Sequence, residues 1–531
     1  MKLGKAALFL IGVLTVGPAV ANPVVQATLA MGNNTAGIGI DIVMQRAFVS
    51  NYDDGTVSVV DVSNLTVLGT IPVGTHPRRL IVNSATNRLY VVNDNAPGSV
   101  TVVDTTTNGV VTTIPVGNNP RTLDADFGVR EVYVTNHTGS SVSIIDTLTN
   151  SVVATVPVGN GPRSPTVNGI LRKVYVPNAT DGTVSVIDAA TRTVAKTVTV
   201  GNGPQYAAVD AAHGKVYVNN VTDQSISVID SATDTVAKTL PSGAGSDDNF
   251  GHVNYAYGRY YLANSAGGTL TIVDTDTATV AATRTVGTNP TQVVADANGG
   301  NVYVVVQGGN LVRVLDAASE AVLNGFAVGS GPWRIFVDDS HLYVLNGNGA
   351  NPDTMTVSTK QNTQANTRVA VEWYHEVFDH YFHTASALEN QVINDGAYAN
   401  DWNRTFGYFR VWTAPGAGRH SVSRFFSTQW GTKSSHFYTA VKSERDLLVA
   451  GVITGWQLEA DEIYYIGLAD YATGACPAGT VPLYRMYNEM LGGAPNHRFT
   501  GSAATRDQMV AQGWVAEGSG PDIVYGCTPP L

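Results

Sequence analysis

Short apolar runs alternate with turn residues over the first two thirds of the chain. The stretch EVYVTNHTGSSVSIIDTLTNSVVATVPVGNGP, residues 131–162, shows the pattern in full. Its apolar runs are rich in Val, Ile and Thr, and Gly, Asn, Asp or Pro residues separate them. Runs of this length and composition predict β-strands joined by tight turns.

This stretch recurs at a nearly constant interval. A glycine that ends a Val-Gly or similar element marks each repeat, at Gly32, Gly74, Gly117, Gly159, Gly201, Gly243, Gly287 and Gly329. The intervals are 42, 43, 42, 42, 42, 44 and 42 residues. Four short strands in each period predict the blades of a β-propeller.

The number of blades follows from a recurring aromatic residue in the second strand. It occurs eight times, at Phe48, Tyr90, Tyr133, Tyr175, Tyr217, Tyr261, Tyr303 and Tyr343. The last unit, 332–358, has only three strands, and VVQATLAMG (24–32) has the pattern of the missing fourth. We predict a mainly β fold with eight blades, closed by residues 24–30 pairing with the strand at about 354–359. Seven blades is the alternative.

An aspartate closes the third strand of seven units: Asp61, Asp104, Asp146, Asp188, Asp230, Asp274 and Asp316. In this position an aspartate can accept hydrogen bonds from the backbone of its own turn. A calcium-ligand role is the alternative, although one carboxylate per blade makes a poor cage.

The unit resembles the YVTN family of β-propeller repeats. The resemblance rests on YVTN (133–136), YVPN (175–178), YVNN (217–220), YVVN (90–93) and a recurring G-x-x-P turn, and covers roughly residues 24–358. It implies a propeller in an exported or cell-surface protein.

Arginines recur where the innermost strands begin. HPRRL, NPRTL and GPRSP place Arg78, Arg121 and Arg163 at one position on adjacent blades, and Arg334 lies close to this position in the last unit. Guanidinium groups that converge at a channel mouth can hold a carboxylate, sulfate or phosphate. The alternative is that each arginine pairs with a nearby aspartate or carbonyl.

The N-terminus predicts export. Residues 1–21 have a positive start, a short apolar core and an A-x-A site, as in a signal peptide, so Asn22 should begin the mature chain. We expect a periplasmic, cell-surface or extracellular protein without a transmembrane segment. The net charge of −11 argues against nucleic acid as a partner.

Composition changes after a polar linker at 359–369. Six of the seven tryptophans lie beyond residue 370. Three related segments follow, each with an aromatic strand, a His-containing strand and a short helix. Thr384, Thr439 and Thr500 are expected as N-caps, and Gly396, Gly451 and Gly513 as glycines after the helix. We predict a small α+β domain, 370–531, with pseudo-threefold symmetry.

The two cysteines, Cys476 and Cys527, flank the third segment. In an oxidising compartment they are expected to form a disulfide. A reactive thiol is the alternative.

The three segments resemble a repeat family of unknown function from secreted bacterial proteins. The matching residues are His436-Phe437-Tyr438-Thr439, His497-Arg498-Phe499-Thr500, Gly513-Trp514 and Glu517-Gly518. In the first segment, DHYFHT has an extra residue before Thr384, and no glycine precedes Trp402. The resemblance implies association with a surface.

The run WYHEVFDHYFHT contains five metal-ligand types: His375, Glu376, Asp379, His380 and His383. Its spacing is not that of the helical zinc-protease motif. His380 has apparent counterparts in His436 and His497, which favours a structural role. We predict no metal, no cofactor and no catalytic residue.

The pattern therefore favours an exported, non-enzymatic binding or scaffold protein. The propeller is a rigid platform, and the C-terminal domain attaches to a glycan, a cell wall or a surface protein, with Trp430 on the binding face. The alternative is an enzyme that acts on an anionic substrate at the mouth of the channel.

Overall fold

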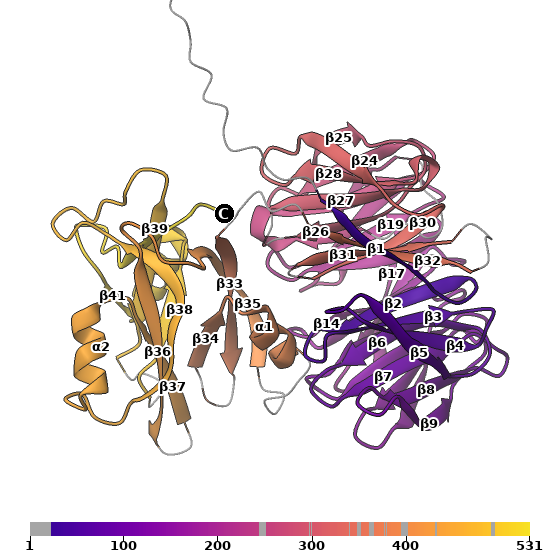
Figure 1. The fold of residues 1–531 in the computed structure, drawn as a ribbon, viewed down its shortest axis with the longest axis horizontal. Coiled ribbons are helices and arrows are strands. Elements are labelled where there is room, and N and C mark those ends of the chain that lie inside the picture. The colour runs from indigo at the N-terminus through magenta and orange to yellow at the C-terminus, as the bar shows by residue number, and fades with distance from the viewer. Residues whose placement is uncertain are drawn as a thin grey trace, which may run out of the picture.

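A computed structural model describes residues 23–531, except 244–250, 297, 299, 339, 348–351, 361–365, 376–377, 379, 395–401, 431–432 and 490–493. For residues 392, 403, 404, 406, 428, 430 and 433 it describes the backbone alone. Figure 1 shows a propeller and a smaller C-terminal domain beside it. The predicted signal peptide, 1–21, lies outside the described residues.

The propeller consists of eight four-stranded antiparallel sheets. The first four blades are β2 (Thr35–Asp41), β3 (Arg46–Asn51), β4 (Thr56–Asp61), β5 (Thr66–Pro72); β6 (Pro77–Asn83), β7 (Arg88–Asn93), β8 (Ser99–Asp104), β9 (Gly109–Pro115); β10 (Pro120–Asp126), β11 (Glu131–Asn136), β12 (Ser141–Asp146), β13 (Ser151–Pro157); and β14 (Thr166–Asn168), β15 (Lys173–Asn178), β16 (Thr183–Asp188), β17 (Thr193–Thr199).

The next three blades are β18 (Pro204–Asp210), β19 (Lys215–Asn220), β20 (Ser225–Asp230), β21 (Thr235–Pro241); β22 (His252–Asn254), β23 (Arg259–Asn264), β24 (Thr269–Asp274), β25 (Thr279–Thr285); and β26 (Pro290–Asp296), β27 (Asn301–Val306), β28 (Leu311–Asp316), β29 (Val322–Ala327). Short 3₁₀ turns, η1 (Tyr255–Tyr257) and η2 (Gln307–Gly309), follow β22 and β27.

The N-terminal strand closes the ring. The eighth blade has the order β1 (Val25–Ala30), β32 (Thr354–Thr359), β31 (His341–Asn346) and β30 (Pro332–Val337). Val25 pairs with Ser358 and Ala30 with Thr354. The prediction of eight blades closed by residues 24–30 is therefore confirmed. Pairing of the two ends of the ring removes a free sheet edge from the last blade.

The recurring aromatic residue forms the middle of each blade. Phe48 and the seven tyrosines of the second strands are each 0–1% exposed. The Asn that ends most second strands also has a defined structural role, because its side-chain amide forms hydrogen bonds to the third strand. Asn136, for example, donates to Ser141 Oγ and Ser143 Oγ, both at 3.0 Å. This amide ties the second strand to the third at the end of the blade.

The repeating glycine has a steric explanation. In seven of the eight units, a Cβ on this glycine would lie 2.4–2.8 Å from the Asn of the following blade. Gly287, the eighth, faces Val306 Cγ1 at 2.8 Å instead. There is no room for a side chain at this position. Glycine therefore recurs in the Val-Gly element because successive blades approach each other closely there.

The aspartates that close the third strands bind their own turns. Asp61 Oδ1 accepts the backbone N–H groups of Ser63 and Asn64, both at 2.9 Å. Asp188 Oδ1 likewise accepts from the N–H of Thr191 at 2.8 Å. The hydrogen bond from the Ser63 hydroxyl, together with these backbone bonds, favours the ionised form and lowers the pKa of Asp61 to about 2.

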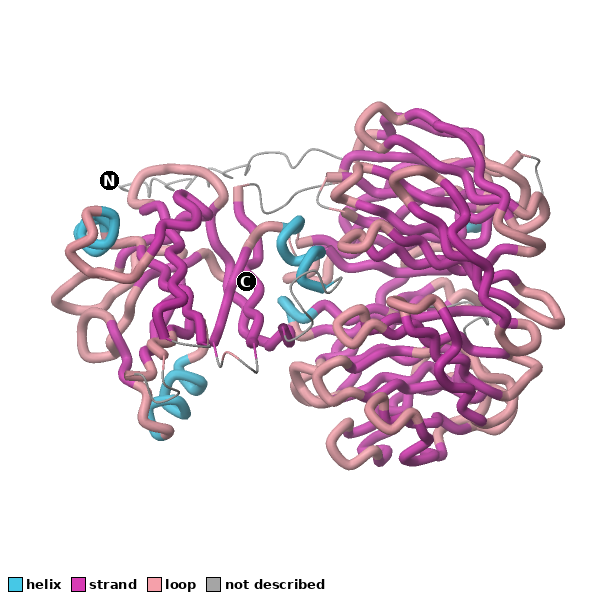
Figure 2. The backbone as a smooth tube through the Cα atoms, turned by 90° about the horizontal axis from the view of Figure 1, so that it is seen from below, coloured by secondary structure: helices cyan, strands magenta, loops and turns pink. Residues whose placement is uncertain are grey.

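The C-terminal domain contains three related units. They are β33 (Thr367–His375), β34 (His380–Thr384), α1 (Ala387–Asn394), β35 (Trp402–Trp412); β36 (His420–Trp430), β37 (Lys433–Thr439), α2 (Lys442–Val449), β38 (Gln457–Leu468); and β39 (Val481–Tyr487), β40 (His497–Thr500), α3 (Ala503–Ala511), β41 (Val515–Glu517), β42 (Gly526–Thr528). Figure 2 shows that the helices belong almost entirely to this domain. The repeated strand–strand–helix–strand order confirms the pseudo-threefold prediction.

The prediction that Thr384, Thr439 and Thr500 are helix N-caps is wrong, because each lies three residues before the first residue of its helix. Ser502, not Thr500, is the N-cap of α3, and its Oγ accepts from Thr505 N at 3.2 Å. Thr500 Oγ1 instead accepts from Ser502 N at 3.1 Å, and so shapes the turn before the cap. Gly451 and Gly513 follow their helices with φ of +70° and +95°, as predicted. Gly396 lies outside the described residues.

A disulfide and a shared core fix the ends of the domain. Cys476 and Cys527 are bonded, with 5.6 Å between their Cα atoms, which confirms the pairing.

Ala256 of η1 belongs to the same buried cluster as Trp373 and Phe409 of the C-terminal domain. Arg410, fully buried, donates to the carbonyl of Asn298 in the propeller at 3.2 Å. The two domains are therefore packed together. Within the described residues, no helix is both long and apolar enough to cross a membrane.

Candidate binding site

The predicted arginine positions lie in different environments. Arg78 is a rim residue whose Nε donates to Asp94, and its guanidinium lies 5.1 Å from the centre of the Tyr52 ring. Arg334 is 7% exposed, and its Nε donates to the carbonyl of Ala36 at 3.2 Å. The Arg334 guanidinium also lies 4.4 Å from the Trp333 ring. Both arginines are thus engaged in packing and pairing around the ring.

Arg121 and Arg163 lie near His137. Burial lowers the pKa of His137, and the positive charges of Arg121 and Arg163 lower it further. His137 Nδ1 lies 3.2 Å from the carbonyl oxygen of Pro162. Side chains of two neighbouring blades therefore both place positive charge near His137.

A cavity of about 220 Å³ lies deeper in the channel. Residues from six neighbouring blades line it. The polar ones are Arg79, Thr122, Asp124, Ser164, Thr166, Tyr206, His252 and Gln292. From the sequence we selected Arg78 as the arginine of this blade, and its neighbour Arg79 was not predicted. The register of β6 shifts between Pro77 and Leu80, and of the two arginines at this shift it is Arg79 that lines the cavity.

The channel side chains hold neighbouring blades together. Asp124 Oδ2 accepts from Val167 N at 2.9 Å, His252 Nδ1 from Ala295 N at 3.3 Å, and Gln292 Oε1 from Ile335 N at 3.0 Å. In each case an acceptor of one blade bonds a backbone N–H of the next. Burial raises the pKa of Asp124 to about 6 and lowers the pKa of His252 to about 4.

Charged pairs join the units of the C-terminal domain. Arg424 of the second unit binds Glu389 of the first at 2.8 Å and Glu459 of its own unit at 2.7 Å. Arg485 of the third unit binds Glu444 of the second at 3.1 Å and Glu517 of its own unit at 2.8 Å. These two junctions are equivalent.

The junction between the third and first units reverses this pattern. Glu372 takes the arginine position, since it pairs with the residue before Thr384 as Arg424 and Arg485 do with those before Thr439 and Thr500. Glu372 is 2% exposed and accepts from Thr405 Oγ1 at 2.6 Å and from Arg498 Nε at 3.1 Å. Thr405 and Thr505 stand where the other units have glutamate. We call Glu372, Tyr374, Thr405, Arg498 and Thr505 the divergent junction.

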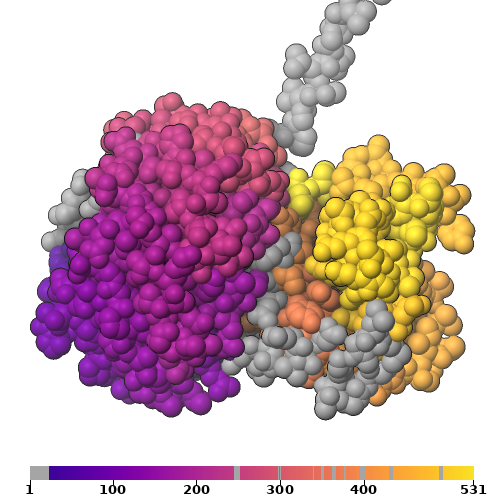
Figure 3. All heavy atoms as spheres, turned by 180° about the vertical axis from the view of Figure 1, so that it is seen from behind, coloured from indigo at the N-terminus to yellow at the C-terminus, as the bar shows by residue number. Residues whose placement is uncertain are grey.

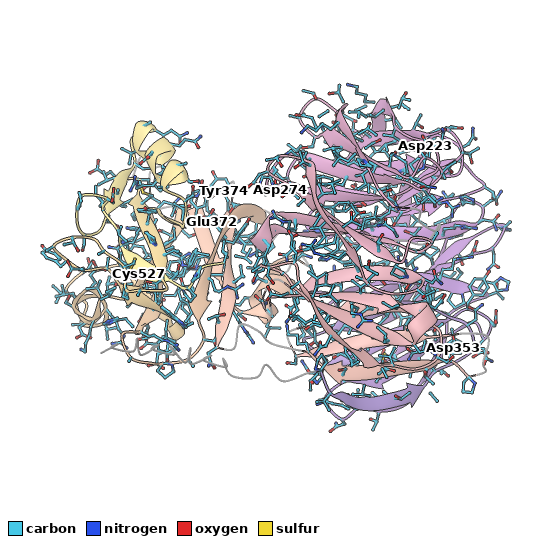
Figure 4. The ribbon with its side chains drawn as sticks, turned by 90° about the horizontal axis from the view of Figure 1, so that it is seen from above. Asp223, Asp274, Asp353, Glu372, Tyr374 and Cys527 are labelled. Atoms are coloured by element: carbon cyan, nitrogen blue, oxygen red, sulfur yellow. A yellow bond between two sulfur atoms is a disulfide. The ribbon has the colours of Figure 1, made fainter. Side chains whose placement is uncertain are left out.

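The divergent junction borders a cleft between the two domains. The cleft has a volume of about 800 Å³, and its walls include Tyr374, Thr405, Tyr408 and Arg498 of the C-terminal domain. Ile170, Ala212 and His213 of the propeller line the opposite wall. Figure 3 shows the hollow between the two domains, and Figure 4 shows Glu372 and Tyr374 on the flank of the C-terminal domain that faces the propeller.

His213 anchors the propeller wall of this cleft. Its Nδ1 lies 2.8 Å from Asp210 Oδ2 and its Nε2 lies 2.6 Å from Asp276 Oδ1. The hydrogen bond with Asp210 raises the pKa of His213, and the charge of Asp276 acts in the same direction. The imidazole is therefore held between two carboxylates.

Most aromatic side chains of the C-terminal domain are core residues. Trp373, Phe409 and Tyr438 are at most 3% exposed. Among the described side chains of this domain, Tyr471, at 89%, is the one aromatic that lies mostly in solvent. Trp430 is the last residue of β36, and its side chain lies outside what the structure describes. The predicted role of Trp430 stays a prediction.

The histidine-rich run is a packed cluster. His380 Nε2 lies 3.0 Å from His436 Nδ1, and the His383 ring stacks on Tyr438 with 3.7 Å between centres. The extra residue before Thr384 shifts the register, so Tyr381, not His380, is the counterpart of His436 and His497. Glu376 and Asp379 are not described. Among the described residues, no three His, Cys, Asp or Glu side chains lie close enough together to hold a metal ion.

Comparison with known families accounts for the smaller domain. Residues 340–466 and 368–523 match the model of a domain of unknown function, DUF5648. The C-terminal domain is a DUF5648 domain. No curated protein matches the chain.

Hydrazine synthase is among the solved structures that resemble the chain, and the resemblance is weak. Hydrazine synthase of Kuenenia stuttgartiensis has 18% sequence identity and a TM-score of 0.44, and the match covers 67% of this chain and 100% of that one. This likeness carries no argument about function. The number of blades is established by the strand pairing and not by this likeness. The divergent junction lies within the DUF5648 domain.

Proposed function

We propose that the protein is an exported, non-enzymatic binding protein whose cleft between propeller and DUF5648 domain takes a saccharide of a glycan or cell wall. The proposal includes the signal peptide at 1–21 and YVTN-family membership of the propeller. Its main support is the position at which the repeated charged pairs of the DUF5648 domain change. Of the three junctions, only the one that borders the cleft has the arginine and the glutamate exchanged between the units and threonines in place of the other glutamates. Function resides in sites added to a fold and not in the fold itself, so we place the site where the repeated units depart from one another.

The lining of the cleft fits a saccharide. Tyr374 and Tyr408 are partly exposed aromatic rings, and flat sugar faces pack well on such rings. Thr405, Ser502 and Thr505 bring hydroxyl groups to the same cavity. A large pocket with an apolar wall and a few polar groups is the usual form of a small-molecule site. The propeller contributes the opposite wall and keeps the cleft in shape.

The test uses the full mature chain in a binding screen against polysaccharides and peptidoglycan. Tyr374→Ala should weaken binding to the captured glycan at least about tenfold, because it removes a ring from the cleft wall. Tyr487 occupies the equivalent place at another junction, since Tyr374 pairs with Tyr381 as Tyr487 pairs with His497. Tyr487→Ala is therefore the matched control and should bind normally. Equal losses in both variants, or no binding by the parent chain, would contradict the proposal.

An enzyme acting on an anionic substrate at the channel mouth is the second candidate. The observation that favours it is the presence of Asp124 and His252 in a cavity that Arg79 also lines. A carboxyl with a pKa of about 6 suits general acid–base catalysis near neutral pH. Turnover that is lost in Asp124→Asn, with binding retained, would support this candidate.

A further inference from the structure

We propose that the protein forms a dimer with a second copy of itself through the outer strands of its first three blades. These strands are β5, β9 and β13. Together with the turns that precede them they comprise residues 62–73, 105–116 and 147–158, which we call the neutral edge. The contact involves the propeller alone, so it does not depend on the saccharide cleft.

The neutral edge has no charged residue, in a chain that has 31 basic and 42 acidic side chains. The matching segments of the fourth to seventh blades each contain at least one charged residue. These residues are Arg192, Lys196, Asp234, Lys238, Asp276, Arg284 and Glu320. The aspartate before each segment recurs in all seven blades and does not distinguish them. One part of the propeller circumference is therefore free of the charges that the rest has.

The exposed side chains of the neutral edge are also larger. Each outer strand from β5 to β25 has a β-bulge at the same place, and the extra residue of the bulge lies in solvent. This residue is alanine in the fourth to sixth blades, at 195, 237 and 281. In the first three blades it is Leu68, Val111 and Val153, which are 40–51% exposed. Large aliphatic side chains of three neighbouring blades thus face solvent.

Lysines cover the corresponding surface in the fourth and fifth blades. Lys196 Nζ donates to the carbonyl of Thr233 in the next blade at 2.9 Å. Lys238 Nζ donates in the same way to the carbonyl of Thr277 at 2.7 Å. In the neutral edge this position is occupied by Gly69, Thr112 and Ala154. Lysine on an outer strand is a usual protection against pairing with another chain, and the neutral edge lacks it.

The outer strands of these blades are accessible. Within the described residues, β9 pairs with β8 on one side and with no strand on the other. Figure 1 shows β9 at the outer edge of the propeller, clear of the DUF5648 domain. β9 contacts β13, and β5 contacts β1, which is also uncharged. A second molecule can therefore reach the neutral edge from outside.

A second copy of this chain fits the neutral edge because of its charge. Two molecules of net charge −11 repel each other, and they approach at least cost where both surfaces are uncharged. In a dimer with a twofold axis at β9, this strand faces its own copy, and β5 and β13 face the same two strands of the other molecule. Burial of their valine and leucine side chains supplies the free energy of association.

Analytical ultracentrifugation of the full mature chain tests for this dimer. We expect a monomer–dimer equilibrium with a dissociation constant between about 1 and 200 μM. Added salt should leave the dimer intact or tighten it, because the contact has no ion pair to screen and the net charges repel. A chain that stays monomeric over this concentration range, or a dimer that salt dissociates, overturns the proposal.

Val111 and Ala237 occupy the same position on different blades and provide matched variants. Val111→Lys should raise the dissociation constant of the dimer at least about tenfold, since twofold symmetry brings the buried charge into the contact twice. Ala237→Lys should change this constant less than about twofold, because it lies outside the contact. Equal effects of the two substitutions, or no effect of Val111→Lys, count against the neutral edge.

Cysteine at the same two positions provides a second readout that stands even if a lysine disturbs folding. The two native cysteines are bonded to each other, so the introduced thiol is the only free one. A short bismaleimide reagent should link Val111→Cys into a covalent dimer and leave Ala237→Cys mostly monomeric. Equal linking of the two variants, or none of Val111→Cys, excludes the neutral edge as the contact.

Discussion

A Cβ atom on Gly117 would lie 2.5 Å from Cγ of Asn136 in the next blade. Asn136 cannot move away easily, because its amide donates to Ser141 and Ser143. Gly117→Ala should therefore destabilise the propeller by about 1–3 kcal/mol, the usual cost of overpacking. Chemical denaturation of the variant and the parent chain measures the difference.

Gly501→Ala is the control for this prediction. A Cβ on Gly501 meets nothing within 4 Å, so this variant should unfold within about 0.5 kcal/mol of the parent chain. A Gly117→Ala variant as stable as Gly501→Ala would show that the blades separate more readily than the packing implies.

The propeller was predictable because the contacts that hold it together are repeated in every blade. The buried tyrosines and the aspartate turns depend on contacts within one blade, and the Val-Gly spacing depends on the contact between one blade and the next along the chain. The channel residues were harder to predict. Arg78 and Arg79 are adjacent and chemically identical, and only the direction of the strand at its first residues decides which one lines the cavity.

Glu372 is expected to be a stabilising residue through its bond to Arg498. Its carboxylate is 2% exposed and accepts from Arg498 Nε and Thr405 Oγ1. Glu372→Gln should destabilise the DUF5648 domain by about 1.5–3 kcal/mol, because it replaces the charge-assisted hydrogen bond from Arg498 by a weaker neutral one. Denaturation followed by the fluorescence of its tryptophans reports this change.

A solvent-exposed pair serves as the comparison. Lys442 and Asp446 are 85% and 47% exposed and lie one turn apart on α2. Lys442→Gln should cost no more than about 0.5 kcal/mol. A similar cost for both substitutions would mean that the divergent junction adds nothing to stability.

The divergent junction could not be found from the sequence alone. Its departures, Glu372, Thr405, Arg498 and Thr505, come from the first and third units and meet only when the domain closes on itself. The sequence showed that the first segment differs at DHYFHT and Trp402. It did not show that the differences compensate one another, or that they face a second domain across a cleft.

The aspartate turns predict a loss of stability in acid. Hydrogen bonds from their turns lower the pKa values of Asp61, Asp104, Asp188 and Asp230. The folded pKa is then below the unfolded one, so this stabilisation is present above about pH 4 and is lost as the pH falls toward 2. Thermal melts between pH 5 and 2 should show a steadily falling Tm. Asp188→Asn should melt below the parent chain at pH 7 and together with it at pH 2, and a constant gap would contradict this account.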